Sequence, residues 1–313
     1  MADWLMVQGN SHHPYDYQPR FVIWASIGAL GSAFILILIK SVGYSSSGST
    51  AMLASLIDSI IDFAVSFVLF LAVRYSLKPA DSDHRYGHGK IEGIAALFQS
   101  AFMICAAIFL IYEAYHKVKL PVEVTHHHIS IGISLIAIAL SIFVVTMQKY
   151  ALMKAPSLLI EADKAHYKTD IALNISVILA LLLDLKTDLR WIDPAFAALI
   201  ALYFIYNAYR IGCNSINMLM DKELPHQIRA HILTLVHQYP QVHGVHDLRT
   251  RASGMAIHIS FDVELNPDLS LREGHDIVRK LEHALIGHYP NAEILIHMDP
   301  MDDIDDTRHN ADV

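Results

Sequence analysis

Cysteine is nearly absent from this sequence of 313 residues, which has two, Cys105 and Cys213. Both fall inside long apolar runs, where an isolated cysteine usually serves only packing. Two such thiols make no disulfide framework, and they are too few for a thiolate metal site. Any metal chemistry must therefore use other ligands, and the chain has 20 histidines and 31 acidic residues.

Two signatures of enzymes are also missing. No H-E-x-x-H run is present, which excludes a zinc protease of that class, and no G-x-x-x-x-G-K-[ST] run offers a nucleotide site. The polar segment at the end of the chain is too small for an ATPase domain. We therefore expect neither an enzyme nor an ATP-driven pump, and we expect no nucleic acid partner.

Charged residues are scarce between positions 21 and 213. Six apolar stretches there are each long enough to cross a hydrocarbon core about 30 Å thick. They run over 21–43, 50–76, 93–115, 129–150, 160–184 and 193–213. A polar tail, residues 1–20, precedes them without a small-residue cleavage site, so the first stretch is a span and not a signal peptide. The sequence predicts an all-α bundle of six transmembrane helices in a lipid bilayer.

An even number of spans puts both termini on one side of the membrane. The basic residues of the short loops favour that side and predict that it is cytoplasmic, in a multi-pass protein of the cell inner membrane. On the terminal side lie Arg20, Arg74, Lys78, Arg85, Lys90, Lys149, Lys154, Arg210 and Lys222; on the opposite side lie Lys40, Lys117, Lys119, Lys186 and Arg190.

A small α+β domain is predicted over residues 214–300. Helix 224–237 opens with Pro225 in its first turn, and helix 270–288 has Ser270 and Glu273 at capping-box spacing. Strands are expected at 245–251, 255–265 and 292–298. The order α-β-β-α-β is that of a metallochaperone-like open sandwich, with both helices over one face of the sheet. Residues 301–313 form an acidic tail.

Asp58 and Asp62 lie one helical turn apart inside the second apolar stretch. A rise of about 1.5 Å per residue puts them roughly 12 to 18 Å deep in the bilayer. An aspartate at such a depth costs about 2.5 to 3.5 kcal/mol, so the pair requires a cation or a proton as partner.

His166 and Asp170 repeat the same spacing in the fifth stretch, and residues four apart share a helix face. The polar line continues through Ser66 on one helix and Asn174 on the other. Facing each other, the two helices would offer three carboxylates and one imidazole, a set that suits Zn²⁺. The alternative is that the pairs are unrelated, Asp58 capping a short helix and His166 lying at an interface.

Further acidic and histidine residues are grouped outside the spans. Asp81, His84 and His88 fall within one short loop and could hold a divalent ion together with a water. We interpret the run His126 to His128 as a surface segment that attracts metal ions weakly. In the C-terminal domain the candidates lie on separate elements, which the sequence alone does not bring together; they are His246, Asp262, His275, His297 and Asp299.

Four motifs together resemble the cation diffusion facilitator family, in its bacterial branch of zinc and ferrous-iron efflux. They are S-x-x-D-S-x-x-D from Ser55, A-D-x-x-H-Y-x-x-D from Ala162, D-H-R-Y-G-H-G-K-x-E from Asp83 and H-D-L-R-T-R from His246. The resemblance covers nearly the whole chain. It implies a homodimeric metal/proton antiporter whose transport site is Asp58, Asp62, His166 and Asp170, with a second site in the loop at Asp81, His84 and His88.

The resemblance also implies a binuclear site in the C-terminal domain, in which Asp299 bridges. Asp262 stands where members of this branch carry histidine, which weakens the prediction for that half-site. His258 lies four residues earlier on the same predicted strand, on the same side of the sheet, and could substitute for it. The family further suggests an interlock between Lys90 and Asp221 that holds the dimer together.

The predicted function is therefore export of Zn²⁺, with Cd²⁺ and Fe²⁺ as further substrates, in exchange for protons. Crowded carboxylates in a low-dielectric bundle take up protons when empty, and a metal ion must expel them. His166 is the natural proton exchanger because its ordinary pKa is about 6.5. Zn²⁺ is also expected as a structural or regulatory ion. The alternative is a membrane metal sensor that binds without transporting.

Overall fold

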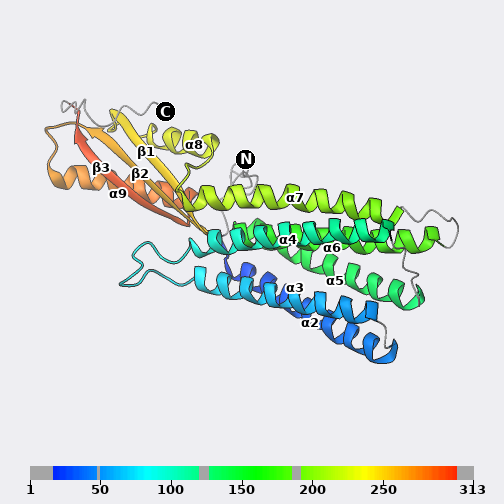
Figure 1. Cartoon of the computed structure of the whole chain (residues 1–313). Helices are drawn as coiled ribbons and strands as arrows, with labels where there is room; N and C mark the ends of the chain where they lie inside the picture. Colours follow the sequence, from blue (N-terminus) through cyan, green and yellow to red (C-terminus); the bar gives the residue numbers. More distant parts are fainter. Residues whose placement is uncertain (1–16, 48–49, 120–126, 185–191, 302–313) are drawn as a thin grey trace.

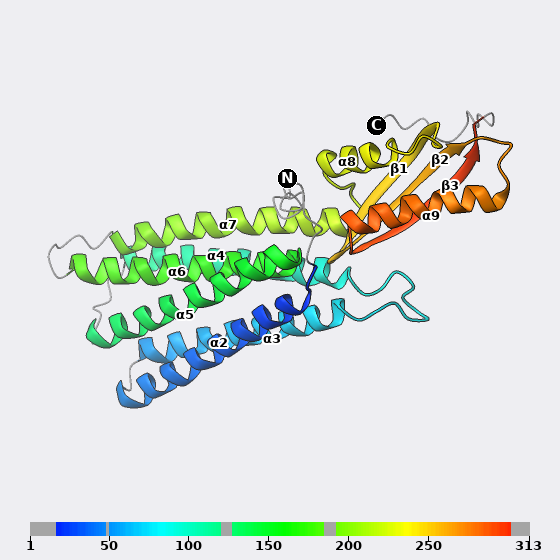
Figure 2. The same ribbon diagram turned by 180° about the vertical axis from the view of Figure 1, so that it is seen from behind.

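The computed structural model describes residues 17–47, 50–119, 127–184 and 192–301 (Figure 1). Most of the polar N-terminal tail, the acidic tail after Met301, and the positions of His126, Lys186 and Arg190 lie outside the described residues. The molecule has an elongated helical region and, at one end of it, a small domain of three strands and two helices (Figures 1 and 2).

Six long helices build the helical region and alternate in direction along its length (Figure 2). They are α2 (Arg20–Ser47), α3 (Thr50–Ser76), α4 (Ile91–Lys119), α5 (His127–Lys154), α6 (Leu158–Asp184) and α7 (Ile192–Leu219). At 27 to 29 residues each, they are about 40 Å long, which exceeds the thickness of a hydrocarbon core. This confirms the predicted all-α membrane bundle.

Among the described helices, α2, α3, α4, α5 and α7 are long and apolar enough to cross a membrane. Helix α6 has the length but is more polar, because its first half contains Asp163, Lys164 and Lys168. It packs against α4, α5 and α7 and also touches α2 and α3. Asp163 and His166 are accordingly 4% and 7% exposed, so this polar side of α6 faces protein.

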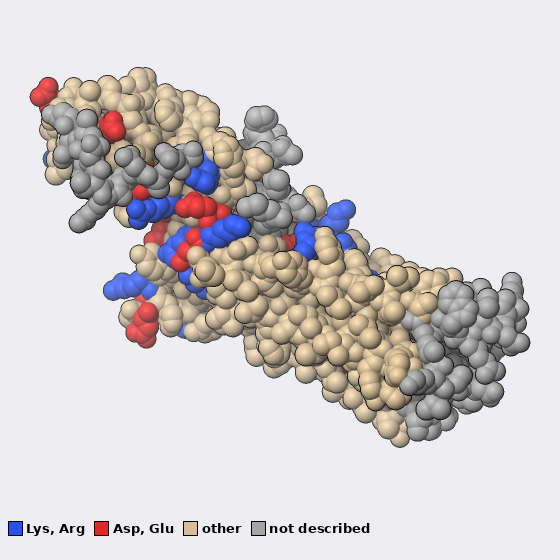
Figure 3. Space-filling view, turned by 45° about the horizontal axis from the view of Figure 1, so that its top comes forward, with Lys and Arg blue, Asp and Glu red and all other residues tan. Residues whose placement is uncertain are grey.

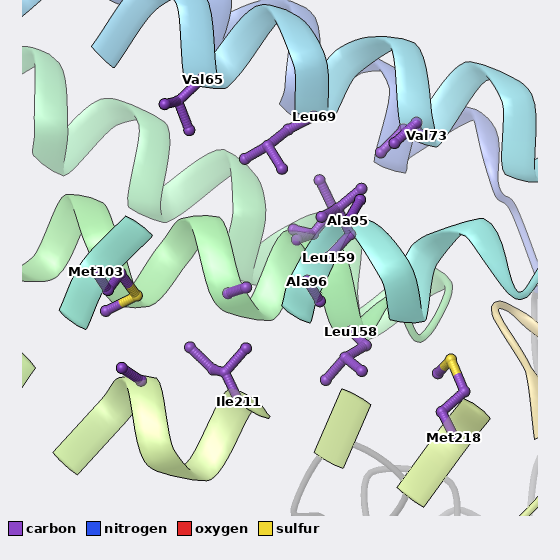
Figure 4. Packing of buried hydrophobic residues seen from close by; sticks show 14 of the residues in the cluster. Val65, Leu69, Val73, Ala95, Ala96, Met103, Leu158, Leu159, Ile211 and Met218 are labelled. Carbon is purple, nitrogen blue, oxygen red and sulfur yellow. The ribbon is translucent and has the colours of Figure 1, made fainter. Parts of the chain in front are cut away.

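Small and branched apolar side chains fill the space between α3, α4, α6 and α7. Figure 4 shows Val65, Leu69 and Val73 on one face of α3, directed toward Ala95 and Leu159. The opposite faces carry large exposed apolar residues such as Trp24 and Phe109, as expected where lipid replaces protein. In the space-filling view the helical region is almost free of charged side chains (Figure 3).

A buried carboxylate fastens the start of α6. Glu92 is 0% exposed, and it accepts hydrogen bonds from Ser157 Oγ at 3.0 Å and Ser76 Oγ at 3.3 Å. The backbone N–H groups of Leu158 and Leu159 also bond to it. Those groups have no partner within a helix, so Glu92 caps α6 while joining it to α3 and α4. The bonds to Glu92 therefore fix the position of α6, and of the residues on it, along the length of the bundle.

The C-terminal domain has the predicted order of elements, α8 (His226–Val236), β1 (Gly244–Ser253), β2 (Ala256–Leu265), α9 (Leu271–His288) and β3 (Ala292–Pro300). The sheet order is β1-β2-β3, with β2 antiparallel to β1 and parallel to β3. Alternate residues of β2, from Ile257 to Leu265, pack under both helices. Ser270 and Glu273 form the predicted capping box, whereas Pro225 precedes α8 as its N-cap.

Replacing Glu92 by alanine should destabilise the protein by about 1 to 3 kcal/mol, because two hydroxyl groups and two N–H groups lose a buried acceptor. Thermal unfolding in detergent measures the loss. Glu113→Ala is the matched control, since Glu113 lies on the same helix and is exposed. Equal melting temperatures for the two variants would contradict the anchoring role of Glu92.

Candidate metal transport site and its relatives

The two predicted acidic pairs meet inside the bundle. His166 Nε2 on α6 lies 3.4 Å from Asp62 Oδ1 on α3 and 3.6 Å from Asp170 Oδ2 on its own helix. The imidazole therefore sits between carboxylates of two different helices. Asn174 continues the line, donating from Nδ2 to the carbonyl oxygen of Asp170 at 2.8 Å.

Asp58 is the most exposed of the four predicted ligands and lies within electrostatic range of Asp62 and His166. Because α3 is continuous from Thr50 to Ser76, Asp58 is in the middle of a helix. The alternative in which it caps a short helix is therefore wrong. The structure brings three carboxylates and one imidazole to one region of the bundle, as oxygen and nitrogen ligands for a divalent ion require.

Two buried polar residues near this region carried no role in the sequence prediction. Gln148 Nε2 on α5 donates to Asp163 Oδ2 at 2.7 Å, and both residues are buried. Asp163 lies one turn before His166 and interacts electrostatically with it. Asp163 lies inside the A-D-x-x-H motif, which pointed to a role in the sequence. Its spacing from His166 alone, however, did not distinguish it from a surface residue.

The prediction that Lys40 belongs to a short loop is wrong. The residue does not lie in a loop but near the end of α2, 9% exposed, with its ammonium turned toward α3. Lys40 Nζ donates to Ser59 Oγ at 2.6 Å and to the carbonyl oxygen of Ser55 at 3.0 Å.

The loop between α3 and α4 brings Asp81, His84 and His88 together. His84 Nδ1 and His88 Nε2 each lie 3.4 Å from an oxygen of Asp81, and the three ligand atoms are within 4.8 Å of one another. Backbone N–H groups of His84 and Asp83 bond to Asp81 and lower the pKa of its carboxyl group. The carboxylate is thus held ionised and oriented between two imidazoles, an arrangement that fits a divalent ion.

In the C-terminal domain the strand register gathers residues from all three strands. His246 on β1 is opposite Asp262 on β2, which is opposite His297 on β3. Asp299 lies between two imidazoles, with Oδ2 3.5 Å from His246 Nε2 and Oδ1 3.1 Å from His297 Nε2. Ligand atoms of His246, Asp262 and Asp299 are within 4.8 Å of one another.

The carboxyl group of Asp262 belongs to this cluster. Burial raises its pKa, the neighbouring His297 opposes that effect, and the negative charge of Asp299 adds to it. Two carboxylates this close to each other favour a bound cation. A divalent ion bound between them would compensate both charges.

Two other histidines of the domain do not join the cluster. His275 is exposed on α9 and is not part of the group of ligand atoms. His258 Nδ1 pairs with Glu293 Oε2 at 3.1 Å, and its ring packs against Tyr86 of the loop. The prediction that His258 could replace Asp262 is therefore wrong, because four residues along an extended strand separate it from the cluster.

The predicted contact between Lys90 and Asp221 is present at the junction of bundle and domain, where charged side chains gather (Figure 3). Lys90 Nζ lies 3.0 Å from Asp221 Oδ2, and Arg251 Nη1 lies 3.1 Å from Asp221 Oδ1. Partial burial opposes ionisation, but the bonds from Lys90 and Arg251 prevail and lower the pKa of Asp221. The backbones also touch, since a Cβ at Gly89 would collide with the carbonyl group of Ser253.

Comparison with known families matches both parts of the chain. Residues 26–220 match the cation efflux transmembrane domain, and residues 224–301 match the cytoplasmic domain of cation efflux proteins. The chain belongs to the cation efflux family. This confirms the resemblance to cation diffusion facilitators that the four motifs predicted.

Similar members of the family share more than a third of their residues with this chain. It is 41% identical to the cation-efflux pump FieF of Shewanella oneidensis, over 92% of this chain and 96% of the relative. It is 37% identical to the cation-efflux pump FieF of Yersinia pestis (strain Pestoides F), over 93% of this chain and 98% of the relative. Among solved structures, the metal-bound C-terminal domain of the CzcD transporter from Thermotoga maritima covers 26% of this chain at 21% identity, with a TM-score of 0.24.

The family fixes the general activity. This chain is a multi-pass membrane transporter for the efflux of metal cations, and those cations are its substrates.

Changing His297 and Asp299 together to alanine should lower the number of Zn²⁺ ions bound per chain and the melting temperature of the metal-loaded protein. The double change removes one imidazole and the carboxylate between the two imidazoles, so a metal that stabilises the domain no longer binds. Metal content by elemental analysis and thermal unfolding measure both effects. His283→Ala, an exposed histidine of α9, is the control. Unchanged metal content in the double variant would rule this site out.

Proposed function

We propose that this cation efflux protein is an antiporter that exports Zn²⁺ from the cytoplasm in exchange for protons, with Cd²⁺ and Fe²⁺ as further substrates. The observation that carries the proposal is the position of His166, whose Nε2 lies between carboxylates of α3 and α6. An ion bound there joins two helices that have few other contacts. Metal occupancy and the relative position of the helices are therefore linked.

The ligand set supports zinc as the main substrate. The four proposed ligands are Asp58, Asp62, His166 and Asp170. Three carboxylates and one imidazole form a set of hard and borderline donors that suits four-coordinate Zn²⁺ and accepts other first-row divalent ions. The similar proteins are named cation-efflux pumps, which agrees with outward movement of such ions.

Proton exchange follows from the crowding of charge. With no metal, carboxylates close together in a low-dielectric bundle repel one another, so protons bind to the site. Metal ligands must lose their protons, so each metal ion that binds releases protons. His166, flanked by Asp62 and Asp170, is the proposed group that exchanges a proton for the metal.

The two sites outside the membrane have a different proposed role. The loop cluster around Asp81 and the sheet cluster around Asp299 both lie outside the membrane helices. Zn²⁺ bound there would act as a structural or regulatory ion. The C-terminal domain matches a family model named as a dimer domain, which supports a homodimer in which this contact helps to hold the two chains.

The proposed orientation puts both termini and the C-terminal domain in the cytoplasm, with the protein in the inner membrane. The basic loop residues support it, now nine on the domain side against four opposite after the reassignment of Lys40 to the bundle interior. The match of residues 224–301 to a cytoplasmic domain agrees with this orientation.

Asp58→Ala and Asp170→Ala should each abolish zinc flux, while the protein still inserts into the membrane and elutes at its normal size. Each change removes one of the four ligands proposed for the ion. The test uses vesicles with a metal-sensitive dye inside and an imposed pH gradient. Glu113→Ala serves as a control for loss of an exposed membrane carboxylate. Near-normal flux from either site variant would overturn the site, and zinc binding without flux in the wild type would favour a sensor.

His166→Asp should reduce the number of protons released per Zn²⁺ bound between about pH 6 and 7.5, because it removes the group with an ordinary pKa near 6.5. The all-oxygen set should also broaden transport toward Mn²⁺ and Fe²⁺. Isothermal titration in buffers of different ionisation enthalpy gives the proton count, with the Asp170→Ala signal subtracted as the contribution of the other sites. Equal proton release by both proteins across this range would show that His166 is not the exchanger.

A further inference from the structure

Lys40 places a positive charge inside the bundle beside the proposed transport site. It is 9% exposed, and its Nζ bonds to Ser59 Oγ at 2.6 Å and to the carbonyl oxygen of Ser55 at 3.0 Å. Ser59 follows Asp58 directly in the sequence, and Ser55 precedes it by about one helical turn. The ammonium group is therefore held on the part of α3 that carries the transport-site carboxylates.

The Lys40 side chain points into the bundle, although it could also have extended toward the membrane surface. Lys40 lies about two turns before the end of α2 at Ser47, and a lysine so placed usually extends toward the membrane surface to reach water. Here the side chain turns inward to α3. Both of its hydrogen-bond acceptors are uncharged, so they do not compensate the charge.

Compensation comes from the transport site. Lys40 is within electrostatic range of Asp58, Asp62 and Asp170. In the part of the chain that the structure describes, these are the carboxylates that act on it. Three ionised carboxylates and one ammonium group, with a neutral imidazole, sum to two negative charges. One divalent ion neutralises that sum.

We propose that Lys40 is the fixed counter-ion of the transport site, a positioning residue that reduces the site's charge to that of one divalent ion. This inference rests on the proposed function of the site. Lys40 contacts no ligand directly and acts through its charge. It lowers the affinity for the metal, so that the ion leaves the site during each transport cycle, and it stabilises the carboxylates when no metal is bound.

Removal of this charge has an effect opposite to that of ordinary structural damage. A neutral residue at position 40 leaves one excess negative charge beside the metal. By Coulomb's law a unit charge within several ångströms of a divalent ion changes its affinity by about tenfold or more, even at an effective dielectric constant of about 20. A distorted site binds metal more weakly, whereas a site without its counter-ion binds it more tightly and releases it more slowly.

The test is Zn²⁺ titration of the purified full-length protein, with the other two clusters disabled in every sample by Asp81→Ala and Asp299→Ala. Lys40→Met should bind Zn²⁺ about tenfold more tightly and show slower flux in vesicles. Lys40→Arg, which keeps the charge, should restore an affinity near that of the parent. Ser59→Ala, which removes a hydrogen bond but no charge, should not tighten binding. Lys40→Gln replaces Lys40→Met if the latter does not fold, since an amide can still bond to Ser59.

The outcomes separate this inference from the proposed function. Unchanged or weaker binding in both neutral variants would overturn the role of Lys40. Tighter binding in Lys40→Arg as well would show that shape and not charge is responsible, and would also overturn it. If Asp170→Ala leaves the Zn²⁺ affinity of the same parent unchanged, the transport site itself is wrongly assigned. Loss of binding in Asp170→Ala together with tighter binding in Lys40→Met supports both.

Discussion

The structure depends most on one constraint: an ionised side chain in a lipid environment must be compensated by another group of the protein. The positive charge of Lys40 is compensated by Asp58, Asp62 and Asp170, and Asp62 and Asp170 also flank His166. Glu92 is placed against hydroxyl and N–H donors instead. Because water is not available to complete these sets, each helix must hold its polar residues at a defined height and rotation. The positions of the charged side chains therefore restrict how the helices pack, and apolar side chains fill the space between them.

This organisation explains why α6 can be so polar. Its N-terminus is fixed by Glu92, and its side is tied to α5 through Asp163 and Gln148. Tyr167 adds a bond from its hydroxyl group to the carbonyl oxygen of Ala29 on α2. By contrast α3, which brings Asp58 and Asp62, has few contacts with α6. The proposed site therefore links α6 to a helix whose main packing partner is α2, and an ion bound there would add to the few contacts between α3 and α6.

The sequence predicted the parts of this picture that depend on local spacing. Asp58, Asp62, His166 and Asp170 could be paired because four residues make one helical turn, and the capping box at Ser270 because its geometry is local. The sequence misplaced Lys40, since a lysine near the end of an apolar run looks the same whether it turns inward or toward water. It also allowed His258 as a substitute for Asp262, because alternation along a strand gives the face of the sheet but not the distance along the strand. Asp163 went unrecognised for a third reason: its partner, Gln148, comes from another helix.

The close approach of Gly89 to Ser253 has a mechanical meaning. Because the two backbones touch without intervening side chains, neither segment can slide past the other. The loop that carries His88 is continuous with α4, and the turn after Ser253 is the tip of the β1–β2 hairpin. The tip of the hairpin therefore rests directly on the start of the membrane helix α4, while His246 and Asp262 lie toward the other end of its two strands. A movement of the sheet would consequently reach α4 through direct backbone contact.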